Sequence, residues 1–168
     1  MPITLELARP PHDPDDFSRA DLQFRGVDHS GPSYEAVVFF DNPRATASTA
    51  RSEDAGFAGS FYVFGHGGCF GELGHCDVRD APKGIYDKRL SHPLTPQFKT
   101  LIITDALRRL MRTSRKRKFT VTVVAAVPKN PASRAPRGDP LQFDSVSLLV
   151  DQDPAAAGVP PPPDVGGR

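Results

Sequence analysis

Hydrophobic and polar residues alternate over several short stretches of the chain, which is typical of β-strands with one buried face. Val, Phe, Tyr and Thr, the residues that favour strands, are frequent in these stretches. The clearest predicted strands cover Tyr34–Phe40 (YEAVVFF), Phe119–Val127 (FTVTVVAAV) and Leu141–Val150 (LQFDSVSLLV). Looser or shorter patterns predict further strands over Ile3–Leu7, Leu22–Val27, Phe57–Phe64 and Phe98–Thr104.

One helix is predicted, from Asp105 to about Arg112. Thr104 is expected to cap it, because its hydroxyl could accept a free backbone N–H of the first turn. The helix has an apolar face made by Ala106, Leu107, Leu110 and Met111. Since only one helix separates two strands, a parallel sheet of βαβ units is not expected. The sequence therefore predicts an all-β fold, an antiparallel β-sandwich of six or seven strands with one short helix.

The chain of 168 residues suggests a single domain. Residues 1–20, which include the segment RPPHDPDD, are predicted to be an N-terminal extension. Residues 21–150 would form the β-sandwich. Residues 151–168 are rich in Ala, Pro and Gly and are predicted to be disordered.

The overall charge gives no reason to expect nucleic-acid or membrane binding, because 21 Lys and Arg balance 20 Asp and Glu. The basic run Arg108–Lys118 is interpreted as cations near the C-terminus of the helix, where they are favoured. It lacks the interleaved aromatic residues typical of nucleic-acid sites. No apolar run is long enough to cross a bilayer, and residues 1–17 have no signal-peptide features. We expect a cytoplasmic chain, unless it is exported with a partner.

The glycine-rich segment 55–78 contains the candidate chemistry of the chain. His66, Cys69, His75 and Cys76 follow one another as H-x2-C-x5-H-C, and these side chains are good ligands for Zn²⁺ or Cu⁺. The spacing matches no standard zinc pattern. A Cys69–Cys76 disulfide is one alternative, and a structural loop with reduced thiols and hydrogen-bonded histidines is another. No complete catalytic constellation is found, so a stand-alone enzyme is not predicted.

Asp28, His29 and Ser30 have the residue types of a catalytic triad, but triad members meet in space and are not neighbours in sequence. A turn in which Asp28 and Ser30 bond the local backbone is the preferred interpretation. Phe64 and Phe70 flank the glycine-rich loop, and from the residues alone they are interpreted as core.

Three pieces of the sequence, in this order, resemble a known domain. They are YEAVVFFDNP (residues 34–43), GFAGSFYVFGHG (residues 56–67), and KTLIITDALRRL followed by FTVTVVAAVP (residues 99–128). The order resembles the C-terminal β-sandwich domain of type 3 copper proteins, the tyrosinase, polyphenol oxidase and haemocyanin family. The segments VDHSGPSYE, GHGGCFGELGHCDV and HPLTPQ look closer to the domain attached to bacterial tyrosinase-like oxidases. The resemblance covers roughly residues 20–150.

The resemblance implies a role beside a dicopper centre, because in this family a separate, mostly helical domain holds two coppers with six histidines. This chain has five histidines, and its sequence places no two on one helix, so it is not expected to build that centre alone. The implied partner is a tyrosinase-like dicopper catalytic domain, fused or separate, that oxidises phenols or catechols. The family role implies shielding, latency or help with copper loading, with Phe64 or Phe70 as a plug in the copper entrance. Copper would be in the partner, or at His66, Cys69, His75 and Cys76.

Overall fold

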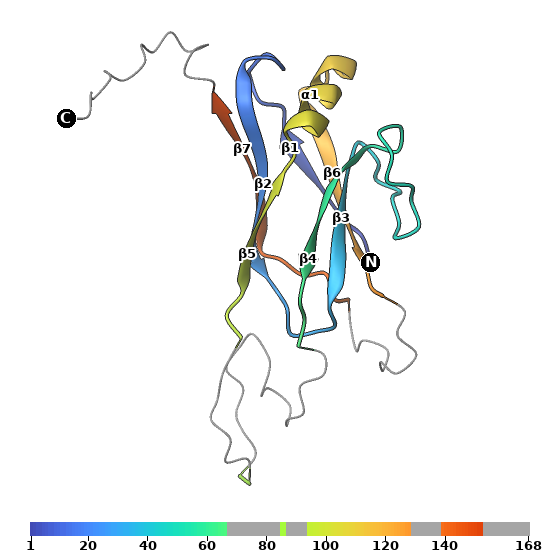
Figure 1. The fold of residues 1–168 in the computed structure, drawn as a ribbon, viewed down its shortest axis with the longest axis vertical. Coiled ribbons are helices and arrows are strands. Elements are labelled where there is room, and N and C mark those ends of the chain that lie inside the picture. Colours follow the sequence, from blue (N-terminus) through green and yellow to red (C-terminus); the bar gives the residue numbers. More distant parts are fainter. Residues whose placement is uncertain (67–84, 87–93, 129–138, 153–168) are drawn as a thin grey trace, which may run out of the picture.

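The structure, a computed structural model, describes residues 1–66, 85–86, 94–128 and 139–152. The described residues form two facing antiparallel sheets (Figure 1), with strand orders β1-β6-β3-β4 and β5-β2-β7. The all-β antiparallel sandwich with one short helix is therefore confirmed. In chain order the elements are β1 (Ile3–Ala8), β2 (Phe17–Val27), β3 (Tyr34–Phe40), β4 (Phe57–Val63), β5 (Gln97–Ile102), α1 (Thr104–Thr113), β6 (Lys118–Ala126) and β7 (Ser145–Gln152).

The main core lies between the two sheets and follows from the alternation of each strand. Successive side chains of a strand point to opposite faces, so Val38 of β3 and its partner Val123 of β6 both point inward, and both are fully buried. Phe24 of β2 crosses the gap between the sheets. Its ring centroid lies 4.7 Å from that of Phe61 in β4 and 5.6 Å from that of Phe143. The contact between Phe24 and Phe61 joins the two sheets directly, and Phe143 packs on Phe24 from the connection before β7.

A second, smaller cluster lies on the other face of the four-stranded sheet. Val37 and Phe39 of β3 pack there with Val124 of β6 and with Ala45 from the connection between β3 and β4. This connection, residues 41–56, therefore covers part of the outer face of the sheet. The rest of that face, toward the end of β4, carries the exposed side chain of Tyr62.

Helix α1 packs against one end of the sandwich (Figure 1), with Ala106, Leu107 and Met111 in the main core. The expected cap by Thr104 is wrong. The residue before the helix is Ile103, no side chain caps the helix, and the Thr104 hydroxyl instead accepts the backbone N–H of Ala20 at 3.0 Å. Thr104 therefore ties α1 to strand β2.

Several element bounds differ from those predicted. β2 begins at Phe17, and β1 pairs with β6, so strands occur on the N-terminal side of residue 21. β7 begins at Ser145, four residues after Leu141, whose buried side chain lies in the connection before the strand. No helix within the described ranges is long and apolar enough to cross a membrane.

Candidate functional site

The glycine-rich segment 55–78 begins with strand β4 and continues into the stretch that carries the candidate ligands. Of its candidate residues, the structure describes Phe64 and His66. Cys69, Phe70, His75 and Cys76 lie outside the described residues. The four-residue metal site, the Cys69–Cys76 disulfide and the plug role of Phe70 therefore stay predictions.

His66 is fixed by its backbone at the point where the chain leaves β4. Its N–H donates to the carbonyl of His29 at 2.9 Å, and the N–H of Gly65 donates to the hydroxyl of Ser33 at 3.0 Å. A Cβ at Gly65 would lie 2.1 Å from the carbonyl oxygen of Gly31, so only glycine fits this close approach. The end of β4 is therefore held against the turn between β2 and β3.

The imidazole rings of His29 and His66 are in edge-to-face contact, with centroids 5.0 Å apart and an interplanar angle of 74°. His29 is buried. Its Nε2 lies 2.9 Å from the carbonyl oxygen of Thr95, and its Nδ1 lies 3.1 Å from Nε2 of Gln97. A carbonyl oxygen only accepts, so Nε2 of His29 carries the hydrogen and Nδ1 accepts from the amide.

Both ring nitrogens of His29 are therefore engaged within the protein, and neither has a lone pair available for a metal. The His66 side chain differs, because it is exposed and no described residue hydrogen bonds to its imidazole. His66 is the histidine of this pair that a ligand can reach. No sequence pattern indicated this contact, since these two histidines come from different connections.

Asp28 and Ser30 form a local turn, as predicted. The Asp28 carboxylate accepts the backbone N–H of Ser30 at 2.7 Å, and no described contact joins the two side chains to His29 as a triad would require. The carboxylate has a second effect on the buried Tyr34. Burial, and to a smaller extent the charge of Asp28, raises the pKa of the Tyr34 phenol to about 12.

Two buried polar atoms near this turn have no hydrogen-bond partner among the described residues. They are the hydroxyl of Tyr34 and Oε1 of Gln97, whose amide nitrogen faces His29. An unpartnered buried polar atom lowers stability, by about 1–3 kcal/mol where no other group compensates it.

An exposed aromatic surface lies beside His66. The side chains of Phe64 and Tyr62 are 74% and 60% exposed, high values for residues that usually contribute to cores or interfaces. Together with Val127 and Pro128 they line a shallow groove of about 510 Å³. The interpretation of Phe64 as a core residue is therefore wrong, because its side chain is largely exposed, and its role as a plug stays a prediction.

The described residues contain no group of three or more His, Cys, Asp or Glu side chains that could hold a metal ion. The fit of the predicted site to a metal therefore rests on His66 and on ligands beyond the described ranges.

The basic run is largely neutralised by acids from other elements. Arg109 pairs with Glu53 at 3.1 Å, Lys116 with Asp41 at 3.3 Å and Lys118 with Glu6 at 3.3 Å. Arg112 is the only member in the last turn of α1, and it pairs with Asp15. The run serves mainly to connect α1 and β6 to the rest of the sandwich.

The sequence matches no protein-family model and shows no significant similarity to a curated protein. Solved structures of a polyphenol oxidase do resemble the fold. The recombinantly expressed latent aurone synthase is 13% identical, with a TM-score of 0.51 over 90% of this chain and 24% of that chain. The latent enzyme from its natural source is also 13% identical, with a TM-score of 0.47 over the same shares of both chains.

The chain thus spans about a quarter of the length of the polyphenol oxidase that it resembles. At this level of identity the likeness concerns the fold and carries no residue roles. It agrees with the antiparallel sandwich described above.

Proposed function

We propose that this chain is a non-catalytic accessory domain of a tyrosinase-like type 3 copper oxidase. It packs over the dicopper site of a catalytic domain, fused or separate, which oxidises phenols or catechols. Its effect is to keep the catalytic domain latent, to stabilise it or to help it to load copper. The likeness in fold to part of a latent polyphenol oxidase carries this proposal, together with the sequence resemblance over residues 20–150.

Phe64 is the side chain best suited to enter the partner's copper entrance. It stands 74% exposed at the end of β4, on a backbone that Ser33 and His29 hold in place. Burial of an aromatic side chain removes a large apolar area from water and often dominates the energy of an interface. Phe70 is a second candidate for the same role, on sequence grounds alone.

The test combines the purified chain with the tyrosinase-like catalytic domain encoded with it. We expect a stable complex and a slower oxidation of catechol. Phe64→Ala should restore most of the rate. Leu149→Ala is the matched control, because Leu149 is also an exposed apolar residue but lies on β7 of the other sheet, and it should leave inhibition unchanged. A lack of association with any such domain would refute the proposal.

A second candidate function is metal binding by His66, Cys69, His75 and Cys76, for delivery or structure. The exposed His66 imidazole at the fixed end of β4 favours it. The chain would be loaded with Cu⁺ and, separately, with Zn²⁺, and bound metal per chain would be measured. One equivalent that is lost in the Cys69→Ser/Cys76→Ser variant supports a site. No bound metal in the wild type rules it out.

The isolated chain is not expected to oxidise phenols. A dicopper centre of this family needs six histidines, and the chain has five, of which His29 has both ring nitrogens occupied. Phenol oxidation by the copper-loaded chain alone would contradict the accessory role.

A further inference from the structure

The sandwich is closed along one side and more open along the other. On the closed side the edge strands β4 and β5 meet, and a Cβ at Gly59 would lie 3.0 Å from the Leu101 side chain. The other two edge strands, β1 and β7, lie on the opposite side. Their core-facing side chains are only partly buried, whereas those of Val38 and Val123 in the central strands are fully buried. These partly buried residues are Ile3, Leu5, Leu7, Val146, Leu148 and Val150.

Strand β7 has a free edge that is suited to pairing. As an edge strand it turns every second backbone N–H and C=O of residues 145–151 away from β2, and no described strand takes them up. Natural edge strands often carry a charge, a proline or a bulge that discourages such pairing. Lys99 in β5 and Glu6 in β1 are charges of this kind, and the register of β4 shifts beside Gly59. β7 has no charge, proline, glycine or register shift from Ser145 to Val150.

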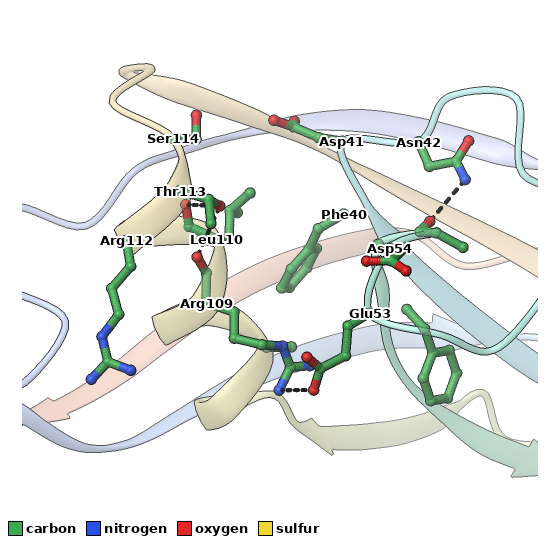
Figure 2. Close-up of a pocket in the computed structure, with 14 residues that line it drawn as sticks. Phe40, Asp41, Asn42, Glu53, Asp54, Arg109, Leu110, Arg112, Thr113 and Ser114 are labelled. Atoms are coloured by element: carbon green, nitrogen blue, oxygen red, sulfur yellow. Dashed lines mark hydrogen bonds and ion pairs between the residues drawn. The ribbon is translucent and has the colours of Figure 1, made fainter.

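The groove between α1 and the connection from β3 to β4 is a weaker surface for a partner. It has a volume of about 560 Å³, and Figure 2 shows Phe40 and Asp54 among the residues that line it. Phe40 is 4% exposed and packs against Phe119 in the core, so its ring is not available to a ligand. The ion pair between Arg109 and Glu53, at 3.1 Å, also bridges the groove. The apolar surface that the accessory role leaves unexplained is therefore the open side.

From these observations we propose that the chain forms a symmetric dimer in which β7 pairs with β7 of a second copy. The two strands run antiparallel around a two-fold axis beside Leu148, so their three-stranded sheets join into one. In this register Val146 lies opposite Val150 of the second copy, and both point toward the core. A strand that pairs with itself forms the self-complementary contact that a two-fold axis requires. The dimer covers the free edge of β7 and brings the partly buried residues of both open sides together.

The charges beside β7 are complementary in this register. Asp151 lies at one end of the strand, and Ser145 lies at the other end, opposite Arg25 of β2. Antiparallel pairing places Asp151 opposite Ser145 of the second copy, one strand away from that copy's Arg25. The exposed Arg25 guanidinium lies over the Phe98 ring in the single chain and can turn toward this carboxylate. The two Asp151 carboxylates stay about 20 Å apart at roughly 3.3 Å per residue, so salt screens their repulsion.

The first experiment measures the mass of the full-length chain by sedimentation from micromolar concentration upward. We expect a dimer that dissociates on dilution. Hydrogen exchange of the ¹⁵N-labelled dimer then locates the contact, because a lone edge strand leaves alternate amides of residues 145–151 open to water. All of these amides should be protected in the dimer. A chain that stays monomeric, or a dimer in which alternate β7 amides exchange fast, would overturn the proposal.

Two opposite substitutions of Ser147 test the pairing of the strands. Ser147 is exposed next to the proposed axis, so Ser147→Lys and Ser147→Glu each place two like charges close together and should weaken the dimer about fivefold. An equal mixture of the two variants should associate at least as tightly as the wild type. Thr100→Lys is the matched control, because Thr100 is exposed opposite the same Gln23 but on β5, at the far edge of this sheet. It should leave the dimer unchanged.

The mixture separates a broken interface from a misfolded chain. A lack of recovery in the mixture, or an equal loss in Thr100→Lys, would refute the pairing of β7. A tyrosinase-like catalytic domain is the alternative occupant of this edge. Protection of the β7 amides that appears only when that domain is added to a monomeric chain would assign the edge to it and refute the dimer. The dimer itself does not rest on the accessory role, because Phe64 follows β4 in the other sheet.

Discussion

Gly56 and Phe40 lock the connection between β3 and β4 through one short hydrogen bond. The N–H of Phe40 donates to the carbonyl of Gly56 at 2.7 Å, while Gly56 adopts a φ of +79°. A Cβ at Gly56 would lie 2.2 Å from the carbonyl oxygen of Phe40. The position therefore requires glycine for both its backbone conformation and the space around it.

Gly56→Ala should lower the free energy of unfolding by about 2 kcal/mol or more, because a left-handed conformation is unfavourable for alanine and the methyl group meets backbone. Urea denaturation measures this change. Gly31→Ala is the control, since a Cβ there meets nothing within 4 Å, and it should leave stability within about 0.5 kcal/mol. A similar loss in both variants would show that the close approach at Gly56 is not the cause.

The raised pKa of Tyr34 predicts a loss of stability at high pH. Above about pH 10 the phenol ionises in the unfolded chain but stays protonated in the folded one, whose pKa is about 12. The unfolded state then binds fewer protons, so the free energy of unfolding falls as pH rises, by up to about 1.4 kcal/mol per pH unit. The loss is complete near pH 12.

Tyr34→Phe tests this directly. The variant should lack the Tyr34 component between pH 10 and 12, which is seen by comparing urea denaturation of both proteins from pH 8 upward. At pH 7 it should be as stable as the wild type or more so, because the hydroxyl is buried without a described partner. Parallel pH curves for the two proteins would contradict the assignment.

Arg108 should be more important for stability than its neighbour Arg112. Its guanidinium donates to the carbonyl of Phe17 at 2.6 Å and that of Pro14 at 3.2 Å, and it lies over the Phe17 ring. Arg108→Ala leaves these carbonyls unpaired and should cost about 2 kcal/mol in thermal or urea unfolding. Among the residues that the structure describes, Arg112 pairs only with the exposed Asp15, so Arg112→Ala should cost under about 1 kcal/mol. Equal losses would show that the helix is not docked through Arg108.

The two histidines in contact should respond differently to substitution. His29→Ala would leave the carbonyl of Thr95 and the amide of Gln97 without their partner, and should cost about 1–3 kcal/mol of unfolding free energy. His66→Ala removes an exposed ring and should cost under about 0.5 kcal/mol. A larger loss at His66 would mean that its ring, and not its backbone, fixes the end of β4.

Strands made of β-favouring residues could be predicted well from the sequence. β3 begins and ends where the composition of YEAVVFF indicates, and both of its faces are buried. Strand starts were less predictable. Phe17 follows a Pro- and Asp-rich segment, and its strand pairing depends on β7, which the local sequence does not reveal. The predicted cap by Thr104 failed because a hydroxyl beside a helix start can accept from more than one backbone N–H. In this fold the Thr104 hydroxyl accepts the N–H of Ala20.

The candidate site was only partly predictable, because its geometry depends on contacts between distant segments. The residue types of the glycine-rich segment identified His66 as a candidate ligand. No pattern indicated that His29 would hold its backbone, or that Asp54 and Phe40 would share a groove with α1. Such contacts come from the sandwich topology, because it brings together connections that are distant in the sequence.

The topology also has a consequence for how the chain folds. β2 is the central strand of its sheet, and both of its neighbours, β5 and β7, are synthesised much later. During translation β2 therefore stays unpaired until β5 has left the ribosome, and its second edge stays open until residues 145–152 have followed. Pairings between such distant segments require costly loop closure, so we expect refolding in milliseconds to seconds, slower than for a helical protein of this size. Exposure of β2 during this interval would make a molecular chaperone more useful to this protein than its modest length suggests.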